Sequence, residues 1–218
     1  MARMRVLYHF AQATFSRRAR LALAHKGLDA ELRDARADDA HHHDARRLWP
    51  VGTIPVLVDD ARVVGDSTAI AHYLDAAYPD HPRLWPTETE AAHAALEVTT
   101  LIDASMNILV DLGTRYFALR KDPAWSAVLE EQMRHAQSAI DRVAERATSP
   151  HLAGDAWSVA DMWTLAATLW VRSFPTRAQT PNIAQLLTLG FRLPEALLRW
   201  AEQHEQRDDV RAIYKANS

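Results

Sequence analysis

Apolar residues follow one pattern in the N-terminal part of the chain and another pattern beyond it. In the N-terminal part they form short runs rich in β-branched and aromatic side chains, at residues 6–10, 54–58 and 62–64. Runs of this kind, bounded by small polar residues, predict buried strands. The last two runs lie on either side of Asp59 and Asp60, which predicts a hairpin.

Two helices are predicted among these strands. Ser16 precedes a segment rich in Ala and Leu, and its hydroxyl is expected to cap a helix that ends at Gly27, where a left-handed residue is favoured. Asp66 or Ser67 is expected to cap a second helix that runs to about Ala77. Together these elements are typical of a compact α/β unit.

The segment between the first helix and the hairpin has a less regular pattern. Residues 30–33 form a further candidate strand, whereas helix and loop are equally compatible with the acidic and histidine-rich residues 34–44. His41, His42 and His43 are consecutive, and consecutive side chains cannot all face one ion in regular structure. We therefore expect a solvated surface there and no metal site.

The pattern changes at a proline-rich stretch. Prolines at positions 79, 82 and 86 predict a stiff linker. We expect an α/β domain at residues 1–78, the linker at 79–87 and an all-helical domain at 88–218.

Strand signals almost vanish beyond the linker, and Ala, Leu, Glu and Arg dominate. This composition predicts long helices. They are expected at residues 88–119, 124–147, 158–173 and 194–205. Ser158 stands three residues before Asp161, which is a carboxylate variant of the capping box and has a stabilising role.

Composition limits the classes of function. A formal net charge of -3 and the absence of any Lys/Arg run exclude a nucleic-acid partner, and no apolar run approaches the length of a membrane span. We expect a cytoplasmic protein. The sequence contains no cysteine, which excludes disulfides, thiolate metal sites and any mechanism with a protein sulfur nucleophile.

Several segments in the same order resemble bacterial glutathione transferases. The sequences LYHF at residues 7–10 and FSRRARLALAHKGL at 15–28 resemble the first strand and helix of that superfamily. WPVGTIPVL at 49–57, DSTAI at 66–70, and LAGD with SVAD within 152–161 follow. The resemblance implies a thioredoxin-like α/β domain followed by an all-helical domain, glutathione as co-substrate, and a homodimer.

The resemblance also implies where glutathione binds. It places Thr53, Ile54 and Pro55 along the peptide, with a cis bond before Pro55 that turns the Ile54 main chain outward to pair as one more strand. It places Ser67 on the γ-glutamyl carboxylate, at a helix start that favours anions, and Asp66 near the ammonium group. An ordinary N-cap is the alternative for these last two residues.

One position departs from the family. Alignment places Ala13 where a serine or cysteine usually donates to the glutathione sulfur, and an alanine side chain donates nothing. Thr14 and Ser16 are the candidate catalytic hydroxyls, although the Ser16 oxygen is equally suited to capping backbone amides. Tyr8 is better explained as a packed strand residue, and Arg17 as a solvated first-turn residue.

A second substrate is expected between the domains, against the first long helix of the helical domain. Candidate lining residues there are Ile102, Met106, Asn107, Val110 and Tyr116, and Trp163 and Trp170 are expected in the core. The leading hypothesis is a transferase that conjugates glutathione to small electrophiles. The alternative is a binding protein on the same scaffold without catalysis, which Ala13 favours.

Overall fold

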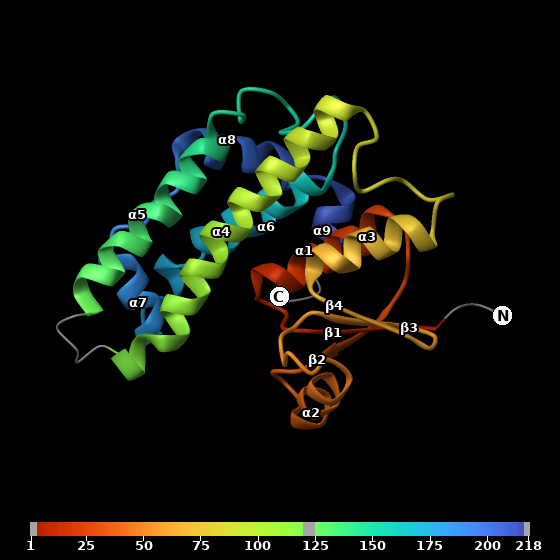
Figure 1. Cartoon of the computed structure of the whole chain (residues 1–218), viewed down its shortest axis with the longest axis horizontal. Coiled ribbons are helices and arrows are strands. Elements are labelled where there is room, and N and C mark those ends of the chain that lie inside the picture. Colours follow the sequence, from red (N-terminus) through yellow and green to blue (C-terminus); the bar gives the residue numbers. More distant parts are fainter. Residues whose placement is uncertain (1–3, 120–124, 216–218) are drawn as a thin grey trace.

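The chain folds into a small sheet with helices on both faces, followed by a bundle of helices (Figure 1). The computed structural model describes residues 4–119 and 125–215. The architecture is a thioredoxin-like α/β domain with an all-helical domain behind it, as the sequence predicted. No helix within the two described ranges is both long and apolar enough to span a bilayer.

The sheet is mixed and has the strand order β2-β1-β3-β4. β1 is parallel to β2 and antiparallel to β3, and β3 pairs with β4 as the predicted hairpin. The strands are β1 (Arg5–His9), β2 (Glu31–Asp34), β3 (Val56–Asp59) and β4 (Arg62–Gly65).

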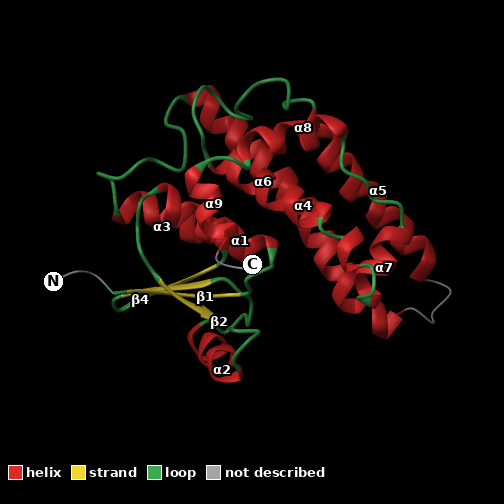
Figure 2. Ribbon diagram, turned by 180° about the vertical axis from the view of Figure 1, so that it is seen from behind, coloured by secondary structure: helices red, strands yellow, loops and turns green. Residues whose placement is uncertain are grey.

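Different helices cover the two faces of the sheet. α1 (Thr14–His25) and α3 (Ser67–Ala77) lie on one face and α2 (Asp39–Leu48) on the other, as both views show (Figures 1 and 2). Strand side chains alternate between the faces. Leu7 therefore joins the main core with α1 and α3, whereas Val6 packs in a smaller core with α2.

The helical domain is organised around α6, which is buried over nearly its whole length. α6 packs against α4 and also against α1 of the first domain, so the main core is continuous across the two domains. The remaining elements are α4 (Thr89–Leu119), α5 (Trp125–Ala144), α6 (Val159–Arg172), a short 3-10 helix η1 (Pro175–Arg177), α7 (Pro181–Thr188), α8 (Glu195–His204) and α9 (Asp208–Lys215).

Most of the predicted local signals are confirmed. Asp66 is the N-cap of α3, Gly27 has a φ of 62° after α1, and Asp161 accepts a hydrogen bond from the Ser158 amide at 2.9 Å in the capping box of α6. The buried amide of Leu152 donates to the other Asp161 oxygen at 2.9 Å, so this carboxylate also fixes the preceding loop.

The predicted start of α1 is wrong. The helix begins at Thr14 with Ala13 as the N-cap residue, so Ser16 lies inside the first turn and does not cap it. Residues 34–44, for which the sequence was compatible with helix or loop, contain the start of α2. The sequence analysis did not predict α7 or α9.

Candidate active site

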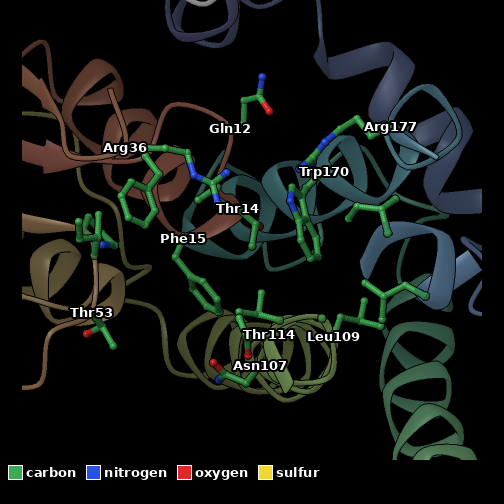
Figure 3. A pocket seen from close by; sticks show the side chains of 18 of the residues that line it. Gln12, Thr14, Phe15, Arg36, Thr53, Asn107, Leu109, Thr114, Trp170 and Arg177 are labelled. Atoms are coloured by element: carbon green, nitrogen blue, oxygen red, sulfur yellow. The ribbon is translucent and has the colours of Figure 1, made fainter. Parts of the chain in front are cut away.

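A pocket of about 430 Å³ lies between the two domains. On the α/β side it is lined by the start of α1 and by the loops that precede β3 and α3; on the other side it is lined by α4, α6, η1 and α7. Figure 3 shows Thr14 and Thr53 from the first domain facing the same space as Asn107 and Trp170 from the second. The pocket therefore joins the predicted glutathione site to the predicted second-substrate site.

Thr14 is the predicted catalytic hydroxyl that the structure places at the pocket. It is the first residue of α1, is only 1% exposed, and its Oγ1 has no hydrogen-bond partner among the described residues. The first amides of a helix also lack partners within the helix and favour negative charge nearby. An unpaired donor at a helix start is suited to holding an anion such as a thiolate.

The structure places Ser16, the other candidate, away from the pocket. Ser16 is fully buried, and its Oγ accepts a hydrogen bond from the Phe10 amide at 3.0 Å. Phe10 itself lines the pocket. Ser16 therefore supports the turn between β1 and α1 and does not line the cavity.

The Ile54–Pro55 bond is cis, as the resemblance implied. Ile54 and Pro55 line the pocket together with Thr53, and the Ile54 main chain makes no hydrogen bond to any described residue. The Pro55 carbonyl accepts from the Asp66 amide at 3.2 Å, which joins this loop to the start of α3. The free main-chain groups of Ile54 are suited to pairing with an extended peptide.

Asp66 and Ser67 lie at the N-terminal end of α3. Asp66 has a φ of 72°, an uncommon and strained conformation for a residue other than glycine. Its Oδ1 accepts from the Thr68 and Ala69 amides at 2.8 and 3.0 Å, while Oδ2 makes no hydrogen bond to a described residue. Ser67 is 1% exposed, and its hydroxyl also lacks a partner among these residues.

Trp49 packs behind the loop that carries Ile54. Its ring covers Gly65, where an added Cβ would lie 2.2 Å from the Trp49 ring. A glycine is therefore required at the end of β4 for the tryptophan to lie flat against it. This contact holds the loop close to the start of α3.

Two further residues considered from the sequence have other partners. The Tyr8 hydroxyl accepts a hydrogen bond from Arg33 at 2.9 Å, and Tyr8 is buried in the sheet. The Arg17 guanidinium lies 4.8 Å from the centre of the Tyr214 ring. Neither residue lines the pocket.

The expectations for the second-substrate side are confirmed only in part. Asn107 and Val110 line the pocket, whereas Ile102 and Met106 are fully buried in the main core. The side chain of Tyr116 lies outside the described residues.

The two tryptophans of α6 have different positions. Trp163 is fully buried, as predicted, whereas Trp170 is 8% exposed and lines the pocket. No sequence signal pointed to Trp170 as a pocket residue.

The charged lining of the pocket was also missed from sequence. Arg36 lines it from the loop after β2, and Arg177 lines it from η1. Burial lowers the pKa of Arg177, and the nearby charges of Arg17 and Arg36 lower it further. Asp66 is the acidic residue among the described lining residues, at the end of the pocket where the sequence predicted glutathione.

The three consecutive histidines lie in α2. His41 and His42 make edge contacts with the rings of Tyr8 and Phe10, with centroid separations of 6.4 and 6.2 Å. Within the described ranges, no group of three or more His, Cys, Asp or Glu side chains is arranged to hold a metal ion.

Comparisons with known proteins agree with this geometry. Residues 7–82 match the family model described as glutathione S-transferase, N-terminal domain. The chain is 27% identical to glutathione S-transferase Z1 of Arabidopsis thaliana over 164 residues, which cover 72% of each protein.

Solved structures are similar over nearly the whole chain. A glutathione S-transferase of Methylobacterium radiotolerans, in complex with glutathione sulfonate, superimposes with a TM-score of 0.75 at 25% identity and covers 96% of this chain and 93% of its own. A rice glutathione transferase in complex with glutathione gives a TM-score of 0.68 at 25% identity and covers 99% of this chain and 94% of its own. With its cis-proline loop, its capped α3 and its helical domain, the chain belongs to the glutathione S-transferase superfamily.

Proposed function

We propose that this protein binds glutathione and conjugates its thiolate to small electrophiles, with Thr14 as the hydroxyl that donates to the sulfur. The observation that carries the proposal is the unpaired, buried hydroxyl of Thr14, which lines the same pocket as Ile54 and Asp66. This hydroxyl lies one residue after Ala13, which has no side-chain donor.

The residues at the glutathione end fit the tripeptide. The unpaired main-chain groups of Ile54 are available to the extended backbone of the peptide. The unpaired Ser67 hydroxyl, with the Ser67 amide at the start of α3, is suited to the γ-glutamyl carboxylate. The Asp66 Oδ2, which is not used in capping, is suited to the ammonium group of glutathione. Thr53 is exposed, directly precedes Ile54 and also lines the pocket.

The chemistry requires a thiolate at neutral pH. A free thiol has a pKa of about 8.5, so most of it is protonated there. A hydrogen bond from Thr14 to the charged sulfur, together with the field at the start of α1, favours the thiolate and lowers this pKa. The relatives named above as glutathione S-transferases support this class of reaction.

Calorimetric titration with glutathione tests the proposal directly. Binding is expected in the wild type, and Ser67→Ala is expected to weaken it by about 1–3 kcal/mol because a bound carboxylate loses a donor. Ser105→Ala is a matched control, since Ser105 is also buried and unpaired among the described residues but belongs to α4, whereas Ser67 directly follows Asp66, which lines the pocket. Absence of binding, or equal affinities in wild type and Ser67→Ala, would show that the assigned site is wrong.

Ala13 supports a second candidate, a glutathione-binding protein without catalysis. Its side chain supplies no donor at the position that the family uses. The two candidates differ in turnover. A rate with saturating glutathione and a model electrophile equal to the uncatalysed rate, with normal glutathione binding, would favour the non-catalytic candidate.

A further inference from the structure

Two arginines reach into the pocket from opposite sides. Arg36 enters from the α/β domain and Arg177 from the helical domain, and Figure 3 shows their guanidinium groups directed toward the middle of the cavity. Arg36 is exposed and lies 5.5 Å from the centre of the Phe10 ring, whereas Arg177 is half-buried. Within the described ranges, neither arginine has a carboxylate within ion-pair distance.

This lack of a partner distinguishes Arg177 from many arginines of the helical domain. Several of those pair with a nearby carboxylate on the surface, namely Arg115, Arg142, Arg146, Arg172, Arg199 and Arg207. Arg177 has lost part of its hydration without gaining such a pair. A half-buried charge in this condition is stabilised when an anion binds beside it.

The position of Arg177 decides which ligand supplies the anion. Arg177 belongs to η1, directly after α6, and Figure 3 shows it beside Trp170. Ile54, Asp66 and Ser67, the proposed glutathione contacts, all belong to the α/β domain. Arg177 therefore faces the part of the pocket left for the second substrate.

Most of the rest of that side is apolar. Its apolar walls are formed by Leu109, Val110, Trp170, Ile183 and Leu186, together with Phe15 of α1, and Asn107 and Thr114 of α4 add two neutral polar groups. Such walls accommodate a hydrocarbon or aromatic body and provide few polar partners. Among the described residues of the helical side, Arg177 is the cationic group, and a cation among mostly apolar walls selects a ligand with an anionic end.

We infer that the second substrate is an electrophile with an apolar body and a carboxylate, and that Arg177 binds this carboxylate. The inference rests on the proposed glutathione-dependent transfer, because it places the carboxylate opposite the sulfur held near Thr14. Arg177 is then a specificity-determining residue, and neutral electrophiles of the same shape are poorer substrates.

A matched pair of probes isolates the charge. A chlorodinitrobenzoate and its methyl ester differ in the anionic group, and both react with glutathione by the same substitution. The glutathione sulfur bonds to the ring carbon that carries chlorine, chloride leaves with the electron pair of the C–Cl bond, and the thiol proton passes to water. Each enzymatic rate is divided by the uncatalysed rate for the same probe, which removes the intrinsic difference in reactivity.

Wild type and three variants are compared with both probes. Arg177→Gln is expected to lower kcat/KM for the benzoate about tenfold, through KM, with the ester little changed. Arg177→Lys is expected to restore part of the loss. Arg62→Gln is the control, because it removes the same charge from an exposed, unpaired position on β4 outside the pocket.

Binding of the two S-aryl glutathione conjugates, measured by calorimetry, gives a result that does not depend on turnover. Tighter binding of the carboxylate conjugate, lost in Arg177→Gln, supports the inference even if the rates are slow. Normal glutathione binding with equal affinities for the two conjugates overturns the inference and leaves the proposed function intact. No binding of glutathione or of either conjugate overturns both.

Discussion

Arg18 of α1 is completely buried and forms an ion pair with Asp103 of α4, so one buried charge joins the two domains. The Arg18 guanidinium also lies 4.5 Å from the centre of the Phe15 ring and 5.5 Å from that of Trp163. Phe15 lines the pocket, and the Trp163 indole donates to the Thr68 hydroxyl at 3.4 Å in the first turn of α3. The pair thus lies behind both sides of the candidate active site.

Asp103→Asn is expected to destabilise the protein by about 3 kcal/mol, because it leaves the Arg18 charge buried and uncompensated. Denaturant unfolding measures this change. The double variant Arg18→Met, Asp103→Leu is expected to recover much of the loss, since it removes both charges and keeps the volume. If Asp103→Asn is as stable as the wild type, the pair has no structural role.

Thr14→Val is expected to reduce kcat/KM by roughly a hundredfold, because it removes one donor to the developing or bound anion with little change in shape. The pKa of bound glutathione, followed by thiolate absorbance, should rise in the same variant, and Thr14→Ser should retain a low value. Ser16→Ala is the contrasting variant. It loses the bond from the Phe10 amide, which is expected to cost about 1 kcal/mol of stability without changing the thiol pKa. A raised thiol pKa in Ser16→Ala, with no change in Thr14→Val, would assign the sulfur contact to Ser16.

His9 of β1 is expected to make stability depend on pH. Burial, assisted by the charge of Arg20, lowers the pKa of His9 from 6.5 to about 4. As the pH falls from about 6.5 to 4, the unfolded chain binds this proton before the folded chain does, so the stability contributed by neutral His9 is lost in that window.

The loss attributable to His9 is at most about 3 kcal/mol. The free energy of unfolding of wild type and His9→Asn, compared across this pH range, measures it. The comparison is needed because Asp75 and Asp209 also have lowered pKa values and contribute to acid destabilisation. Parallel curves for the two proteins would contradict the assignment to His9.

Gly65→Ala is expected to displace the Trp49 ring, because the new methyl group would overlap it. We expect a loss of about 1–3 kcal/mol of stability and weaker glutathione binding, since Trp49 supports the loop that carries Ile54. Unfolding and calorimetry measure the two effects. In a Trp49→Ala background the same glycine substitution should have much less effect, and an equal effect there would exclude the ring contact as the cause.

Local interactions explain the parts of the fold that were predictable. The hairpin, the Asp66 cap of α3 and the Ser158–Asp161 capping box each depend on residues close together in sequence, and all three are confirmed. The helices α2, α7 and α9 are short, with 10, 8 and 8 residues. Such helices are stable only when packed against the rest of the protein, so their sequences alone did not predict them.

The sequence by itself determined the two-domain architecture and the absence of a protein thiol, because these follow from patterns and residue types, and the resemblance to a known family implied the cis bond before Pro55. Only the tertiary structure decided which hydroxyl meets the pocket. The turn after β1 uses the Ser16 oxygen to pair the Phe10 amide, which starts α1 at Thr14 and leaves that hydroxyl unpaired. Arg36 and Arg177 are far apart in sequence, and only the packing of α6 against α1, with η1 directly after α6, brings both charges into one cavity.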